Sequence, residues 1–253
     1  MGINETLIKI SHKIPNKFKI GIKALTGKLT YNQDGLATQH NCNFMNDKHF
    51  IECYNLAVDH GLAVDPNIHW RAHVACWAAL QAKNLGGDFI ECGVNKGFLS
   101  KIICEYIDFN SLPNIDFYLL DTFEGLSEKY ISQTEKDAGR TAGGYEPCYD
   151  IVKKEFAKYG TVRIIKGVIP ETLDQVLLKK GIAYLSIDLN NVIPEIAAAE
   201  YFWDSMLSGG IILLDDYGFK GFEEQRKAFD KFAMERGIQV LSLPTGQGLI
   251  IKP

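Results

Sequence analysis

The sequence predicts one α/β domain built on a seven-stranded, mostly parallel sheet, preceded by a helical N-terminal extension. Two observations carry this prediction. Short runs that are apolar on both faces alternate with helix-length segments, which is the pattern of a parallel sheet covered by helices on both sides. The last two runs are joined only by Pro244–Gln247, which is too short for a parallel crossover, so the final strand is expected to run antiparallel.

The extension is expected to span residues 1–65 and the domain residues 66–253. Residues 1–30 contain six lysines and one glutamate, a net charge of +5, whereas the other residues have a net charge of −9. We favour a solvated leader that packs on its own acidic domain or on a sister subunit, as a lid or an oligomer contact. Contact with a membrane surface is the alternative. Residues 31–65 are polar and weakly periodic, and they are expected to form loops around a short helix at 48–60.

The next helix is expected to begin near Asp65, which can cap it, and Pro66, which suits a first turn. The Gly86-Gly87 pair ends it. Its apolar residues fall on one face at helical spacing: Trp70, Val74, Trp77 and Leu80. His69 and His73 lie four apart on this helix, but no third metal ligand follows, so both are interpreted as surface or core-edge histidines.

The predicted strands follow this helix in chain order. They are Asp88–Cys92, Asp116–Asp121, Val162–Lys166, Ala183–Asp188, Ile211–Asp215, Gln239–Leu243 and Gly248–Ile251. Between the second and the third lies the long segment 124–150, which has no strand pattern. Because long loops after a strand end often cover active sites, this segment is predicted to be a lid.

Composition excludes several classes of protein. The 253 residues have a mean hydropathy of −0.07, and no apolar stretch is long enough to span a bilayer. The net charge of −4 argues against a nucleic-acid binder. Six cysteines form no Cys-x-x-Cys pair, and the N-terminus does not resemble a secretory signal. These features predict a cytoplasmic protein with free thiols.

Ligands of such a sheet bind beyond the carboxyl ends of its strands. The first strand ends in Glu91–Gly97, whose two glycines allow a sharp turn and a close approach to a ligand, although no dinucleotide or triphosphate fingerprint is present. The second ends in Asp121-Thr122-Phe123, where the acid suits ribose hydroxyls and the ring an adenine face; the alternative is an Asp that caps the next turn. The third leaves through Gly167-Val168, whose main chain could border the adenine.

Carboxylates gather at the ends of the fourth and fifth strands. Asp188 follows one apolar run, and Asp215 and Asp216 follow the other. Three acids at one edge of a sheet repel one another and need a cation, and oxygen ligands without His or Cys favour Mg²⁺ over Zn²⁺. The structural alternative is that Asp216 caps a helix and that Asp188 is exposed in a turn.

Together these segments resemble the macrocin O-methyltransferase family of class I S-adenosylmethionine-dependent methyltransferases, over about residues 66–253. The segments that carry the resemblance are 88–94, 121–126, Gly167 with 170–173, and 209–217. The resemblance implies a Rossmann-like fold. It also implies Mg²⁺-dependent transfer of a methyl group from S-adenosyl-L-methionine to a sugar hydroxyl of a glycosylated natural product or glycan. Members assemble as homo-oligomers in which N-terminal segments help to build neighbouring sites.

The resemblance also implies roles for single residues. Glu91 and Gly93 would contact the methionine part of the cofactor, Asp121 its ribose, and Thr122 with Phe123 its nucleoside. The other implied cofactor-binding residues are Val94, Asn95, Ser100, Gly167 and Val168. The implied Mg²⁺ ligands are Asp188, Asp215 and Asp216, and Asp188 would also take the proton of the acceptor.

One departure from the family concerns the acceptor. In the family Gly-Asp and a Tyr follow the fourth-strand Asp, whereas here Leu189-Asn190-Asn191 follow it, so the acceptor can differ from the known sugars. Two alternatives stay open. One is a metal-dependent O-methyltransferase that acts on a catechol or another vicinal diol. The other is a cofactor-binding subunit without catalysis.

Overall fold

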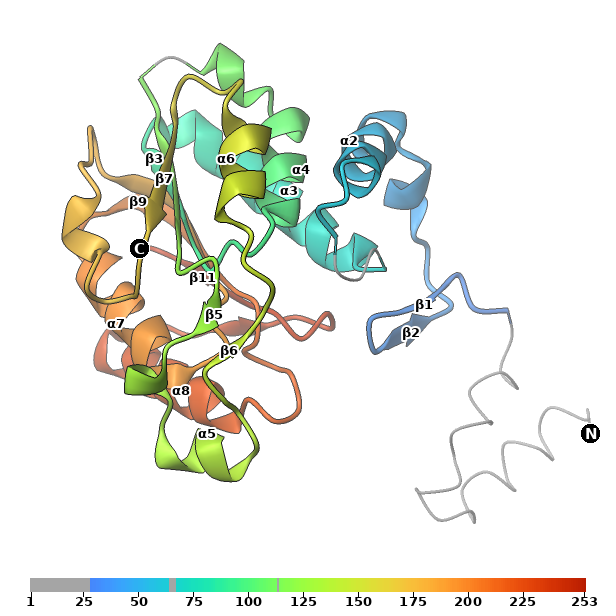
Figure 1. The fold of residues 1–253 in the computed structure, drawn as a ribbon. Helices are drawn as coiled ribbons and strands as arrows, with labels where there is room; N and C mark the ends of the chain where they lie inside the picture. The colour runs from blue at the N-terminus through green and yellow to red at the C-terminus, as the bar shows by residue number, and fades with distance from the viewer. Residues whose placement is uncertain (1–27, 64–66, 113) are drawn as a thin grey trace, which may run out of the picture.

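The computed structural model describes residues 28–63, 67–112 and 114–253. Its centre is a seven-stranded sheet in the order β10-β11-β9-β8-β3-β4-β7 (Figure 1). The strands are β3 (Asp88–Cys92), β4 (Phe117–Asp121), β7 (Val162–Lys166), β8 (Ile182–Ile187), β9 (Met206–Leu214), β10 (Leu241–Ser242) and β11 (Gly248–Ile251). Each of these strands overlaps one of the strands predicted from the sequence. The largest difference is at β9, which begins five residues before Ile211.

Strands β7, β4, β3, β8 and β9 run parallel, and β11 pairs antiparallel with β9. The predicted α/β fold class and its antiparallel last strand are therefore confirmed. The chain leaves β3 for β4 on one side and later returns to place β8 on the other. The sheet order reverses at this point, so the carboxyl ends of β3 and β8 diverge and leave room for a ligand.

Side chains that alternate along each strand enter two separate cores. In β3, Phe89 belongs to one core and Ile90 to the other. The first core lies under α3 (His69–Ala82), α4 (Phe98–Tyr106) and α6 (Tyr149–Phe156). The second lies under α7 (Val192–Trp203) and α8 (Glu223–Glu235), so that helices cover both faces of the sheet (Figure 1).

The described part of the N-terminal extension packs on the domain. Helix α2 (Lys48–Asp59) confirms the predicted short helix, and it buries Phe50 and Tyr54 in a third core with α3 and α4. The segment before it was predicted as loop, but it contains a hairpin of β1 (Tyr31–Gln33) and β2 (Leu36–Thr38). The signal was weak because each strand has only three residues. Most of the lysine-rich segment lies outside the described residues, and the boundary at residue 65 stays a prediction.

Helix α3 begins at His69, and the expected cap at Asp65 and Pro66 lies outside the described residues. The apolar stripe read from the sequence is not its most buried face, since Trp77 remains 44% exposed. The buried residues are small, which lets the helix approach the sheet closely: Ala72, Ala75, Cys76, Ala78, Ala79 and Ala82. His69 stacks on Tyr54 and His73 on Phe44, in agreement with their interpretation as core-edge residues.

The segment between β4 and α6 is folded, and it contains two strands that the sequence pattern did not indicate. Strands β5 (Gly125–Leu126) and β6 (Gly143–Gly144) pair antiparallel, and α5 (Gln133–Asp137) lies between them. These strands are two residues long and consist mainly of glycine, so no alternation could be seen. We call residues 125–148 the insertion. Within the described residues, no helix is long and apolar enough to cross a membrane.

Candidate active site

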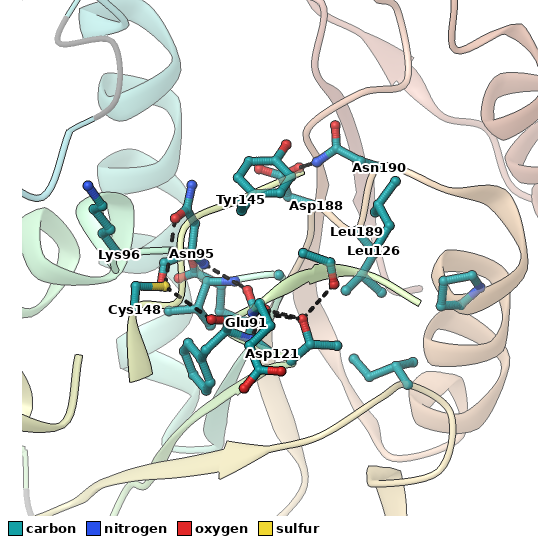
Figure 2. A pocket seen from close by; sticks show the side chains of 18 of the residues that line it. Glu91, Asn95, Lys96, Asp121, Leu126, Tyr145, Cys148, Asp188, Leu189 and Asn190 are labelled. Atoms are coloured by element: carbon teal, nitrogen blue, oxygen red, sulfur yellow. Dashed lines mark hydrogen bonds between the residues drawn. The ribbon is translucent and has the colours of Figure 1, made fainter. Parts of the chain in front are cut away.

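A cavity of about 330 Å³ lies at the carboxyl ends of the central strands. Its walls come from the loop after β3, the start of the insertion after β4, the turn after β7 and the loop after β8 (Figure 2). Leu62, Ala63, Ile68 and Arg71, before and within the first turn of α3, also line it. Most sequence-predicted residues line it: Glu91, Gly93, Val94, Asn95, Asp121, Thr122, Phe123, Gly167, Val168 and Asp188. Segments far apart in the chain thus meet where the strand order reverses, as expected for this fold.

Glu91 points into the cavity from the end of β3 and is 4% exposed. Burial raises the pKa of its carboxyl group to about 8, although the hydrogen bond that it accepts from Ser100 Oγ at 2.7 Å opposes the rise. Ser100 itself is fully buried in α4 and does not line the cavity. The predicted contact of Ser100 with a cofactor is therefore replaced by an indirect role, in which Ser100 orients Glu91.

Asp121 ties the loops after β3 and β4 together. Its Oδ2 atom accepts hydrogen bonds from the backbone N–H groups of Val94 and Asn95, at 2.6 and 2.7 Å. Its Oδ1 atom accepts one from the N–H of Phe123 at 2.6 Å and only a long one, 3.3 Å, from the hydroxyl of Thr122. The acid therefore organises both loops, and Oδ1 retains capacity for one further donor.

The three predicted acids converge at the ends of neighbouring strands. Because Ile187 of β8 is in register with Leu214 of β9, Asp188 lies opposite Asp215, and Asp216 follows. Each of the three offers an oxygen within 4.8 Å of the others. Burial, and next the charge of Asp215, raise the pKa of Asp188 well above its usual range and that of Asp216 to about 7. Such a cluster is costly unless a cation neutralises it.

The donor set fits a hard divalent cation. The Oδ2 atom of Asp216 is buried and has no hydrogen-bond partner, and Asp188 faces the cavity. Asp215 is partly neutralised, because Arg71 Nη1 donates to its Oδ2 at 2.6 Å and Gln247 Nε2 to its Oδ1 at 3.1 Å. Asp188 and Asp216 are thus the more available ligands, and oxygen atoms alone suit Mg²⁺.

Besides Arg71, which also lines the cavity, Asn190 and Tyr145 lie near the acid cluster without having been predicted as site residues. The amide of Asn190 donates to Asp188 Oδ1 at 3.0 Å. Figure 2 shows the ring of Tyr145, from the insertion, beside Asp188 and Asn190. Tyr145 is 44% exposed, and burial together with the charge of Asp188 raises the pKa of its hydroxyl. A single aromatic residue in a glycine-rich segment gives no sequence signal for this position.

The comparison with protein families decides the identity of this fold and site. The family model described as Macrocin-O-methyltransferase (TylF) matches residues 71–241, which is more than half of the chain. The chain belongs to the macrocin O-methyltransferase family. It is therefore an S-adenosylmethionine-dependent O-methyltransferase, and the resemblance inferred from the strand-end residues is confirmed. This membership supports an enzyme over the non-catalytic alternative.

Solved structures share the fold of this macrocin O-methyltransferase family member at low identity. The O-methyltransferase NovP is 16% identical with a TM-score of 0.65, over 75% of this chain and 82% of NovP. CalS11, a calicheamicin methyltransferase, is 14% identical with a TM-score of 0.50, over 98% and 90%. An O-methyltransferase from Bacillus cereus in complex with SAH is 14% identical with a TM-score of 0.51, over 81% and 91%. No curated protein matches the chain.

Proposed function

We propose that this enzyme methylates a hydroxyl group of a sugar on a glycosylated natural product or glycan, and that it requires Mg²⁺. The observation that carries the proposal is the convergence of Asp188, Asp215 and Asp216, because Asp188 lines the same cavity as Glu91 and Asp121. A metal-binding acid cluster beside a cofactor cavity suits an acceptor with two neighbouring oxygens. Two proteins that share the fold support the proposal: NovP is described as an O-methyltransferase, and CalS11 as a TDP-rhamnose 3′-O-methyltransferase of calicheamicin biosynthesis.

Within this proposal the two halves of the cavity have different tasks. Glu91, oriented by Ser100, gives up its proton when the cofactor binds, and its carboxylate holds the ammonium group of the methionine moiety. Asp121 Oδ1 accepts a ribose hydroxyl in place of its long contact with Thr122. The backbone of Gly93, Val94 and Asn95 lines the methionine part. The backbone at Gly167-Val168 and the ring of Phe123 border the adenine.

The acid cluster prepares the acceptor. Asp188 and Asp216 would hold Mg²⁺, with Asp215 completing the set, and the bound cation would lower the pKa of the acceptor hydroxyl. Asp188, which faces the cavity, accepts the hydroxyl proton. Tyr145 covers the acceptor and excludes water. The walls hold the acceptor oxygen in line with the sulfonium methyl group, and this positioning supplies much of the rate. Homo-oligomer formation and a role of the lysine-rich segment in it stay predictions.

The test is methyl transfer from S-adenosylmethionine by the full chain. Acceptors would be nucleotide-linked and glycoside-linked deoxysugars, with a catechol as the rival class, each with Mg²⁺ and with EDTA. The proposal expects transfer to a sugar that EDTA abolishes and Mg²⁺ restores. Transfer to the catechol alone would move the acceptor to the rival class. Full activity in EDTA would remove the metal from the proposal.

A further inference from the structure

Arg71 connects two carboxylates that lie in different parts of the fold. Its Nη1 atom donates to Asp215 Oδ2 at 2.6 Å, inside the acid cluster. Its Nε and Nη2 atoms donate to Asp34 at 2.7 and 3.2 Å. Asp34 lies at the tip of the β1–β2 hairpin, between Gln33 and Leu36. The guanidinium group, whose side chain is 18% exposed, therefore forms one ion pair with the hairpin and another with the acid cluster.

The first turn of α3 holds this hairpin in place. Next to Arg71, His69 Nδ1 is 3.0 Å from the side-chain oxygen of Gln33. The backbone N–H of Trp70 points to the hydroxyl of Tyr31 at 3.4 Å, and the two rings meet edge to face. Three consecutive helix residues thus contact three of the hairpin residues. The position of Asp34 relative to Arg71 is set by these contacts as well as by the ion pair.

The charges around Arg71 have a consequence for any cation in the cluster. The guanidinium group of an arginine is effectively always charged in a protein, and here it lies within hydrogen-bond distance of both Asp215 and Asp34. A positive charge in direct contact with Asp215 repels a divalent cation and competes for one of its oxygens. Asp34 attracts the same guanidinium group from the other side and weakens this competition.

We propose that Arg71 is a resident counter-cation of the acid cluster and that Asp34, acting through Arg71, sets the affinity of the cluster for a divalent cation. Arg71 and Asp34 are positioning residues in this inference, because neither needs to touch the acceptor or the methyl group. The inference rests on the metal site of the proposed function. It makes the β1–β2 hairpin, whose last residue lies 50 positions before the first residue of β3, part of the metal chemistry.

The test is direct titration of the full chain with Mn²⁺, with free Mn²⁺ followed by electron paramagnetic resonance. Arg71→Met should bind Mn²⁺ about 10-fold more tightly or better, because the competing charge is lost. Asp34→Asn should bind it roughly 3-fold more weakly, because Arg71 then interacts with Asp215 alone. In the Arg71→Met background, Asp34→Asn should have no further effect, since Asp34 acts through Arg71.

Two controls separate this charge effect from general damage. Arg71→Lys keeps one positive charge and should stay within about 3-fold of the unchanged chain. Arg163→Met removes an arginine that pairs with Asp116 at the β7 edge, and it should leave Mn²⁺ affinity unchanged. Circular dichroism checks the fold, and if Arg71→Met fails to fold, Asp34→Asn and Arg71→Lys decide the question.

The inference is overturned if Arg71→Met binds Mn²⁺ no more tightly than the unchanged chain, or if neither binds it. It is also overturned if Asp34→Asn weakens binding equally with and without Arg71. Binding that is seen only in Arg71→Met supports it, because the guanidinium group then occupies the place of the cation. Failure to methylate any sugar would overturn the proposed function and leave these affinity ratios unaffected.

Discussion

The backbone carbonyl of Asp188 lies only 1.7 Å from the position that a Cβ atom of residue 93 would occupy, so Gly93 is required where β3 ends. Gly93 also has a φ of 93°, which side chains rarely adopt. The N–H of Asp188 bonds to the carbonyl of Cys92 at 2.8 Å, directly beside this contact. The cofactor loop and the first acid of the cluster therefore meet at a single glycine.

Gly93→Ala should consequently damage both halves of the site. The added methyl group must displace the backbone of Asp188, and we expect the free energy of unfolding to fall by about 2–4 kcal/mol. Chemical denaturation measures this change. Gly160→Ala is the matched control, because residue 160 has open space around it, and it should change stability by less than about 0.5 kcal/mol. Equal stability of the two variants would contradict the tight contact.

Asp121→Asn tests the organisation of the cofactor loops. An amide cannot accept all the hydrogen bonds that Val94, Asn95 and Phe123 donate, because one of its ends is itself a donor. We expect S-adenosylmethionine affinity to weaken by about 1–3 kcal/mol, measured by calorimetry. Asp137→Asn, an exposed substitution in α5, is the control. Unchanged affinity in Asp121→Asn would show that the loops and the ribose are held by other groups.

Sequence patterns predicted most of the sheet and of the site because both depend on local order. A buried parallel strand is a short apolar run, and the residue after it is at the carboxyl edge, so the positions of Asp121, Asp188 and Asp215 followed from strand boundaries. The contact between Arg71 and Asp215 could not be predicted in this way. It joins residues 144 positions apart through side chains, and nothing in the sequence around Arg71 indicates its direction.

Packing between elements also explains where the sequence-based predictions of α3, the β1–β2 hairpin and Ser100 differ from the structure. The stripe of Trp70 and Trp77 carries large apolar side chains, yet α3 packs through its alanines, because close approach to the sheet requires small side chains. The β1–β2 hairpin was missed since three-residue strands show no alternation. The exact role of Ser100 also required coordinates, because a residue one turn into a helix can face either the cavity or the strand behind it.

Glu91 should make stability depend on pH. Its folded-state pKa of about 8 lies above the usual value of 4.5, so the folded protein retains a proton that the unfolded chain has lost. The stabilisation is present below pH 4.5 and is lost as pH rises to about 8. Glu91→Gln, which stays neutral, should flatten this dependence and be more stable above pH 8, by on the order of 3 kcal/mol.

Denaturation curves between pH 5 and pH 9 measure this effect. Ser100→Ala provides a second check, because the hydroxyl of Ser100 favours the charged form of Glu91. Without it the pKa of Glu91 should rise further, and the loss of stability should extend to higher pH. A Glu91→Gln curve parallel to that of the unchanged chain would mean that Glu91 is already ionised at neutral pH.

Tyr145 should act on the acceptor and leave the cofactor unaffected. Its half-exposed ring lies beside Asp188, where an acceptor sugar would have to bind. Tyr145→Ala should raise the KM for the acceptor about 10-fold, because an apolar sugar face loses its aromatic contact, while S-adenosylmethionine affinity stays the same. Tyr201→Ala removes a similarly exposed tyrosine from α7 and should leave both values unchanged. A weaker cofactor affinity in Tyr145→Ala would place the ring against the cofactor.

Asp188→Asn tests the residue on which two proposed roles meet. As a ligand, Asp188 supplies part of the negative charge that retains Mg²⁺, and as a base it accepts the acceptor proton. The substitution is nearly isosteric, and it removes the charge and the basicity together. We expect kcat to fall by about 10²–10⁴-fold in a methyl-transfer assay. Raising the Mg²⁺ concentration should not restore it, because the base is missing.

Asp215→Asn separates the two roles. It weakens metal binding and releases Arg71 but leaves the carboxylate of Asp188 in place, so raising Mg²⁺ should restore part of the activity. S-adenosylmethionine affinity should stay near normal in both variants, because the proposed cofactor contacts, Glu91 and Asp121, come from β3 and β4. If Asp188→Asn turned over at the unchanged rate in EDTA, the metal and the base would both have to be assigned elsewhere. If Mg²⁺ restored both variants equally, Asp188 would be a ligand only.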